Sequence, residues 1–168
     1  MASTDPEQDV SVAYKILTTS EYEAIQPLIS KAEGQSDHHI SAPRWSGTAL
    51  DLKDGFVHLS APWQALATAK RFFGDVDSLV LLEIDLGQIA PGCLRWEVAA
   101  AVQRECIAAS TLSATSSKDA VVAATFPHVY DGLDLAAVKQ VIKVSRLAAG
   151  SDQHHAPTWD SVWPIATL

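Results

Sequence analysis

A histidine and a serine stand two residues apart in the short apolar run Gly55-Phe-Val-His-Leu-Ser60. If this run is extended, its side chains alternate between two faces, and Phe56, His58 and Ser60 share one of them. Imidazole titrates near neutral pH and a strand would hold it rigidly, so His58 is a candidate general acid or base. The alternative is a core histidine satisfied by one backbone partner. Ser60 is a candidate ligand contact, although a serine just before Ala61-Pro62 is also a favoured helix cap.

A second histidine shows the same two-residue spacing to a polar neighbour. His128 precedes Tyr130 by two positions, and Arg95 precedes Glu97 by two, so each pair shares a face if its segment is extended. If His128 and Tyr130 face His58, the three residues would supply an acid, a base and an orienting donor without a metal or cofactor. The alternative is a set of hydrogen-bonded struts between strands, with Arg95 and Glu97 forming an ion pair.

Other standard chemistries have no motif in this sequence. The adjacent pairs His38-His39 and His154-His155 point in different directions and have no carboxylate at helical metal spacing, so we expect no metal site. A glycine-rich phosphate loop, a Gly-x-Ser-x-Gly elbow and a Cys-His nucleophile pattern are all missing. Cys93 and Cys106 are too few for a disulfide framework, which favours a reducing, cytoplasmic setting.

Composition narrows the class of protein further. With 168 residues and 48% hydrophobic content, the chain suits one folded domain with flexible ends. The net charge of -8 provides no positive field for a polyanion, so nucleic-acid binding is disfavoured. Residues 1–9 have neither a basic region nor an apolar core, and no segment approaches a membrane span, so we expect neither a secretory signal nor a membrane contact.

The candidate residues must be positioned by short strands and few helices. Strands are predicted at Val10–Leu17, Ser78–Asp85, Cys93–Val98, Thr125–Tyr130 and Gln140–Leu147. The continuous apolar run of Ser78–Asp85 is typical of a central strand, whereas Pro127 argues against a central position for its own strand. The sequence thus divides into a flexible arm (1–9), a single domain (10–147) with an Ala/Ser/Thr-rich insertion at about 99–124, and a C-terminal tail (148–168).

Helices are predicted where capping patterns occur. Ser20 and Glu23 form a capping-box pattern for a first helix, which Pro27 should interrupt or kink. Ser60 is placed to cap a helix that reaches about Phe73 and ends at Gly74.

Three less regular segments complete the chain. Gly34 to Asp54 is predicted to be a long ordered loop, in which Trp45 could line a pocket, and Asp134 can cap a short helix after the Asp131-Gly132 turn. In the tail, Trp159 and Trp163 could pack back on the domain or onto a partner chain, which leaves a homo-oligomer open.

Three ordered motifs carry a family resemblance. The runs Gly55-Phe-Val-His-Leu-Ser60, Leu94-Arg-Trp-Glu97 and Phe126-Pro-His-Val-Tyr130, the last continuing as Gly132-Leu-Asp-Leu-x-Ala-Val, resemble those of the family called domain of unknown function 952. Tyr14-Lys-Ile16 and Ser46-Gly-Thr-Ala-Leu-Asp51 fall upstream in the expected order. The resemblance covers about residues 12 to 146.

That family looks distantly like the ADP-ribosyltransferase superfold, which clasps NAD. The resemblance implies an α+β fold with a split, mainly antiparallel sheet and few short helices. Superfold members place a histidine or arginine on the first strand, where this chain has Tyr14 and Lys15, and often a late glutamate for which no match is evident here. Fold alone does not assign function, so NAD-dependent ADP-ribosyl or phosphate transfer is the second hypothesis.

The first hypothesis is a cofactor-free isomerase, cyclase or lyase of a biosynthetic pathway, acting on a small, fairly apolar organic molecule. A third is a non-catalytic ligand-binding module. The predicted catalytic residues are His58, His128 and Tyr130, and the predicted substrate contacts are Tyr14, Trp45, Phe56, Ser60, Arg95 and Glu97.

Overall fold

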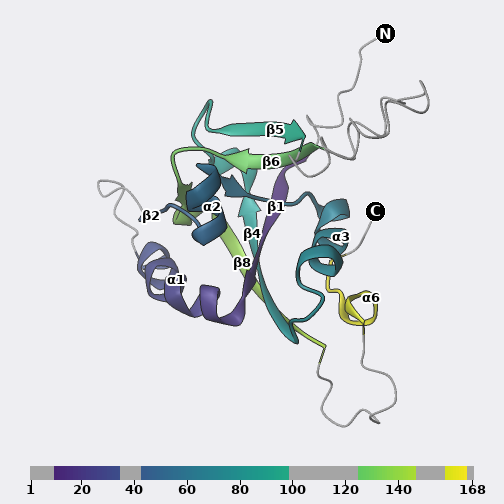
Figure 1. Cartoon of the computed structure of the whole chain (residues 1–168). Helices are drawn as coiled ribbons and strands as arrows, with labels where there is room; N and C mark the ends of the chain where they lie inside the picture. The colour runs from purple at the N-terminus through teal and green to yellow at the C-terminus, as the bar shows by residue number, and fades with distance from the viewer. Residues whose placement is uncertain (1–9, 35–42, 99–124, 147–157, 166–168) are drawn as a thin grey trace, which may run out of the picture.

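The computed structural model describes residues 10–34, 43–98, 125–146 and 158–165 (Figure 1). Predictions for residues 1–9 and for the insertion at 99–124, and those for Cys106 and the two adjacent histidine pairs, lie outside the described residues. Within the described part, no helix is long and apolar enough to cross a membrane.

The central sheet consists of three antiparallel strands in the order β1-β4-β8. They are β1 (Val12–Thr18), β4 (Ser78–Asp85) and β8 (Val138–Ser145). The prediction that Ser78–Asp85 is central is confirmed, and its apolar run is buried because both faces of the sheet are covered.

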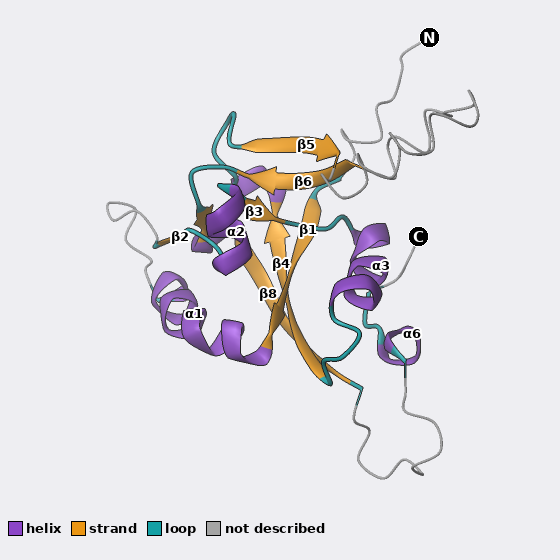
Figure 2. Cartoon of the chain, in the orientation of Figure 1, coloured by secondary structure: helices purple, strands orange, loops and turns teal. Residues whose placement is uncertain are grey.

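Helices cover the two faces of this sheet, with α1 (Thr19–Glu33) on one side and α3 (Pro62–Phe72) on the other (Figure 2). The side chains of β1 alternate between the two faces of the sheet and so contribute to the hydrophobic clusters on both sides. Ala13 and Leu17 pack in the cluster with α1, whereas Tyr14 and Ile16 pack in the cluster with α3. Lys15 therefore lies on the α1 side of the strand, opposite its neighbour Tyr14.

A second antiparallel sheet has the order β3-β6-β5 and carries the histidine motifs. Its strands are β3 (Val57–His58), β6 (Thr125–Val129) and β5 (Leu94–Val98). The register places His58 opposite His128. Backbone hydrogen bonds of 2.8 and 2.9 Å between Tyr14 and Ser60 connect this sheet to β1.

The position of β6 corrects one prediction, because the strand with Pro127 is the middle of three. The carbonyl of Pro127 accepts a hydrogen bond from the Leu59 amide at 2.9 Å. The amide hydrogen that proline lacks would point to the same side, where the two-residue strand β3 has already ended. The short neighbour strand therefore makes the proline tolerable.

The segment before β3 corrects another prediction. Instead of being irregular throughout, it contains β2 (Arg44–Trp45) and α2 (Ala49–Asp54). Strand β2 pairs with β7 (Leu133–Asp134). Helix α2 begins with a capping box between Thr48 and Asp51 and ends at Gly55 in the left-handed conformation.

The first helix begins two residues earlier than predicted. Thr18 and Glu21 form its capping box, since the same residue spacing occurs directly after β1. Pro27 lies inside the helix without ending it. Its cost is offset because Tyr22, Ile25 and Ile29 are buried against the core.

Ser60 does not cap α3, because its backbone is held by Tyr14 and the helix begins after Ala61 with Pro62 in its first turn. Gln64 takes the capping role by accepting from the Ala61 amide at 3.1 Å. The helix reaches its cap at Phe73, one residue before the predicted Gly74.

The remaining elements are short. Asp134 caps the 3-10 turn η3 (Leu135–Ala137) as predicted, and a similar turn, η2 (Leu86–Gln88), follows β4. Helix α6 (Trp159–Val162) packs beside α3. With mixed helices and antiparallel sheets the fold is α+β, and its likeness to the ADP-ribosyltransferase superfold stays a prediction.

Candidate functional site

Two histidine rings face each other across the β3-β6 ladder. We call His58 and His128 the histidine pair; their ring centroids are 5.3 Å apart and the rings are nearly perpendicular. Phe56 stacks on His128 at 4.1 Å and also contacts His58 at 4.6 Å and Tyr130 at 5.3 Å. The structure thus brings three of the predicted site residues together around a fourth, Phe56.

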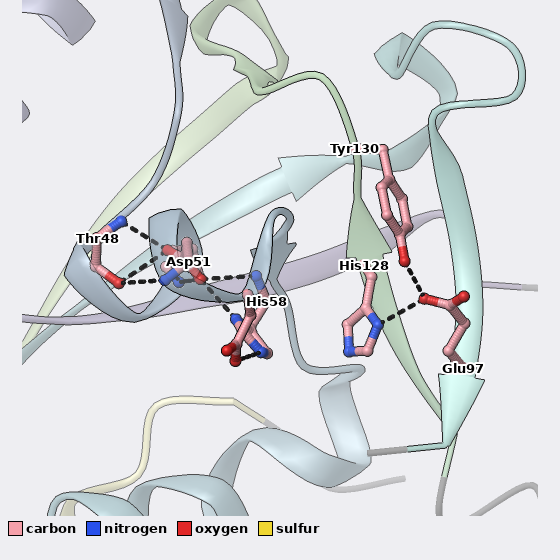
Figure 3. Close-up of polar contacts among 8 residues, drawn as sticks. Thr48, Asp51, His58, Glu97, His128 and Tyr130 are labelled. Atoms are coloured by element: carbon pink, nitrogen blue, oxygen red, sulfur yellow. Dashed lines mark hydrogen bonds and ion pairs between the residues drawn. The ribbon is translucent and has the colours of Figure 1, made fainter. Parts of the chain in front are cut away.

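A fully buried carboxylate orients His58 (Figure 3). Asp51 Oδ1 lies 2.7 Å from Nδ1 of His58 and also accepts the His58 amide at 3.0 Å. An ionised carboxylate can only accept, so Nδ1 is the protonated nitrogen and Nε2 is left for proton exchange. Nε2 lies 3.3 Å from Oδ2 of Asp54, which is partly exposed like the histidine itself.

Asp51 collects further donors from β1 and from the start of α2. Lys15 Nζ lies 2.8 and 2.6 Å from its two oxygens, and Thr48 donates to Oδ2 from its amide at 2.7 Å and its hydroxyl at 2.9 Å. Burial acts to raise the pKa of Asp51, but the His58 hydrogen bond and the Lys15 charge outweigh it and hold that pKa well below its usual range. Burial lowers the pKa of Lys15, and Asp51 counteracts this.

The second histidine has a carboxylate partner of its own. Glu97 Oε2 lies 3.0 Å from Nδ1 of His128 and accepts from the Tyr130 hydroxyl at 2.8 Å. These two hydrogen bonds lower the pKa of Glu97, and the same carboxylate raises the pKa of Tyr130. Burial lowers the pKa of His128, with Glu97 opposing the shift. Each member of the pair therefore presents Nδ1 to a carboxylate.

The two carboxylates differ in their access to water. Asp51 is fully buried, whereas the Glu97 side chain is 38% exposed. Beside Glu97, the guanidinium of Arg95 stacks on the Tyr130 ring at 4.4 Å from its centroid. Arg95 and Glu97 thus share a face as predicted, and both reach Tyr130.

Three of the predicted substrate contacts lie elsewhere. Trp45 is buried in the core on β2 rather than lining a loop, with Lys15 5.8 Å from its ring centroid. Tyr14 donates to Glu83 at 3.2 Å on the α3 side of β1, where burial first and Glu83 second raise its pKa to about 12. Ser60 is buried and bonds Thr68 at 3.2 Å.

The sequence reasoning missed the residues that support His58. Asp51 was part of a recognised motif, but its role depends on a contact with β1 that no local pattern reveals. Two signals were present. Thr48 and Asp51 have the spacing of a capping box, and Lys15 is a charged residue within an otherwise apolar strand.

Two hollows in the described surface, of about 430 and 350 Å3, lie away from the histidine pair. The larger is lined by the exposed side of α3, and the smaller lies between α1 and the ends of β4 and β8. Across the described ranges, no three or more His, Cys, Asp and Glu side chains are grouped so as to hold a metal ion.

Comparison with known proteins gives a fold relative and a family. The crystal structure of protein CC0527 from Caulobacter crescentus is similar with a TM-score of 0.53 and 28% identity, covering 89% of this chain and 96% of that one. Its solution structure gives a TM-score of 0.51 at the same identity, over 90% and 95% of the two chains. None of the curated proteins matches. The family model described as "Protein of unknown function (DUF952)" matches residues 29–141, and the chain belongs to that family.

Proposed function

We propose that the protein is a cofactor-free enzyme that moves protons on a small, largely apolar organic molecule, as an isomerase, cyclase or lyase does. The observation that carries this proposal is the histidine pair itself. Two imidazoles 5.3 Å apart, each with Nδ1 on a carboxylate, have the form of an acid and a base that share one substrate.

The surroundings of the two rings suggest different roles for them. His128 is buried and its pKa is lowered, so it is neutral near pH 7 and suits the base. His58 has a carboxylate near each ring nitrogen, Asp51 at 2.7 Å and Asp54 at 3.3 Å. An imidazolium donates from both nitrogens, so this geometry suits the acid.

A keto–enol step illustrates the chemistry. His128 Nε2 takes a proton from the carbon beside a carbonyl, the C–H electron pair forms the C=C bond, and the carbonyl oxygen takes the proton of His58. For a β,γ-unsaturated carbonyl compound this step gives a dienol. Protonated His128 then returns its proton to the γ carbon while His58 takes back the proton of the enol oxygen and the C=O re-forms. The C=C bond has moved, both histidines are restored, and there is no net change in electrons. The Tyr130 hydroxyl, whose pKa is raised, stays protonated and donates its one hydrogen to Glu97, so its oxygen can accept a hydrogen bond from the substrate.

The lining supports a neutral ligand over an anionic one. Asp54 and Glu97 place two partly exposed carboxylates at the histidine pair, and Phe56 adds an apolar wall. These two carboxylates outnumber the one guanidinium beside them, that of Arg95, and the net negative charge opposes the diphosphate of NAD. NAD-dependent transfer therefore ranks below proton transfer.

The test is to incubate the purified protein with a metabolite extract in deuterated water and to search by mass spectrometry for deuterium incorporation. We expect label in a small set of metabolites with the wild type and its loss with His58→Ala and with His128→Ala. Lys70→Met, an exposed site on α3, is the matched control and should label as the wild type does. Identical labelling by the wild type and both folded histidine variants would contradict the proposal, and clear binding of NAD in a thermal-shift assay would favour the alternative.

A further inference from the structure

We propose that Lys15 and Asp51 form a positioning pair in which Asp51 fixes the tautomer of His58 and Lys15 balances the charge of Asp51. The inference deepens the proposed function and rests on it. Neither residue is placed to touch a substrate, because both are buried and their charged atoms contact each other, Thr48 and His58. Their effect must therefore pass through His58.

The geometry gives Asp51 the tautomer role. Its Oδ1 binds both the amide and Nδ1 of His58, so the backbone and the ring are held by one atom. Its Oδ2 is occupied by Lys15 and by Thr48. A carboxylate anchored on this side cannot rotate away from the imidazole, which leaves Nε2 as the atom that exchanges a proton.

Lys15 has the opposite electrostatic effect from Asp51. A buried carboxylate beside an imidazole without other compensation would hold the imidazolium strongly, as an ion pair. The ammonium of Lys15, with contacts of 2.8 and 2.6 Å, offsets that negative charge. His58 can then release its proton to a substrate instead of retaining it.

The titration of His58 depends on every charged or titratable group that faces it. Asp51 and Asp54 come from α2, Lys15 from β1, and His128 from β6, with Glu97 of β5 behind it. Since Asp54 and Glu97 are unchanged in the variants below, the two buried residues can be tested separately. They must move the titration of His58 in opposite directions.

The experiment is an NMR titration of 15N-labelled histidine side chains in the free, full-length protein. For Lys15→Met the titration midpoint of His58 should rise by about one pH unit, in the range that a charge a few ångströms away produces. For Asp51→Asn it should fall by a similar amount, and the nitrogen shifts should report a mixture of tautomers. Lys15→Arg keeps the charge and should restore the wild-type midpoint, whereas Lys70→Met should leave it unchanged.

Lys15→Gln provides a second neutral variant if Lys15→Met does not fold, because its amide can still donate to Asp51. It should also raise the midpoint. The proposal is overturned if the neutral Lys15 variant leaves the midpoint within the scatter of repeated titrations, or if it moves in the same direction as Asp51→Asn. A purely structural role would lower the melting temperature without these opposite shifts. Because no substrate is used, failure of the positioning role is distinguishable from failure of the proposed enzymatic function.

Discussion

At the scale of single residues, the two histidines share one kind of partner in two different environments. The Asp51–His58 contact involves a fully buried carboxylate, where water and salt screen little. The Glu97–His128 contact involves a carboxylate that is 38% exposed, where screening is stronger. We therefore expect the Glu97–His128 contact to respond more readily to ionic strength than the Asp51–His58 contact.

Glu97→Gln should lower the pKa of Tyr130. The pKa is raised now because loss of the phenolic proton would break the hydrogen bond to Glu97 and place two negative charges side by side. A neutral glutamine removes the repulsion, so the phenol ionises at lower pH. Ultraviolet titration of the three tyrosines measures the change.

Glu83→Gln is the matched control for this titration. It acts on Tyr14, whose pKa of about 12 owes most to burial and only secondarily to Glu83. The pKa of Tyr14 should therefore remain raised in this variant. Tyr130 should be unaffected by the control. If Tyr130 titrates identically in the wild type and in Glu97→Gln, the shared hydrogen bond does not exist in solution.

At the scale of elements, period-two alternation was sufficient to group the residues on the strands. It predicted that Phe56 and His58 share a face, and that His128 shares one with Tyr130. It could not find Lys15 or Asp51, because their contact joins β1 to α2 across 36 positions of the chain. Alternation within one strand carries no information about which helix covers it.

Helix α2 has only six residues, yet it positions the carboxylate on which His58 depends. Asp51 is both the third residue of the helix, where it completes the capping box with Thr48, and the acceptor for His58. The same side chain thus fixes the start of the helix and the orientation of the imidazole. Any substitution that shifts this helix should therefore change the orientation and the titration of His58.

Gly47→Ala tests this coupling. Gly47 has φ of 104°, and a Cβ placed there would lie 2.3 Å from the Cβ of Asp51. The variant must displace Asp51, at a cost of ~1–3 kcal/mol for overpacking in addition to the left-handed strain. Urea denaturation measures the loss, and the NMR titration of His58 should shift with it.

Gly55→Ala separates the strain from the clash. Gly55 also has a positive φ, of 85°, but an added Cβ would meet nothing within 4 Å. It should therefore cost only about 1–2 kcal/mol for the left-handed conformation and leave the His58 titration unchanged. Equal losses in the two variants would show that Asp51 is not held against Gly47.

At the scale of the whole molecule, β1 divides the protein into two hydrophobic clusters with different tasks. The α1 side holds Lys15 and Asp51, and the α3 side receives the tail. The sequence left open whether the tail tryptophans pack on the domain or on a partner. Trp159 packs on the domain, with 2% exposure and an indole that donates to the Phe73 carbonyl at 3.1 Å. Self-association through the rest of the tail stays a prediction, to be checked by light scattering.

The strength of this docking should come from apolar burial rather than from charge. The Lys70–Asp160 ion pair at 3.0 Å is about half exposed on both sides, so it contributes little. Trp159→Ala removes a buried indole that also lies under the guanidinium of Arg146 at 4.9 Å, and it should cost about 3–5 kcal/mol. Denaturant unfolding measures this loss.

Trp63→Ala, at a tryptophan that is 39% exposed, is the matched control and should cost under ~1 kcal/mol. Similar losses in the two variants would mean that Trp159 is not buried in solution. Because β1 separates the clusters, the NMR titration of His58 should be the same in both.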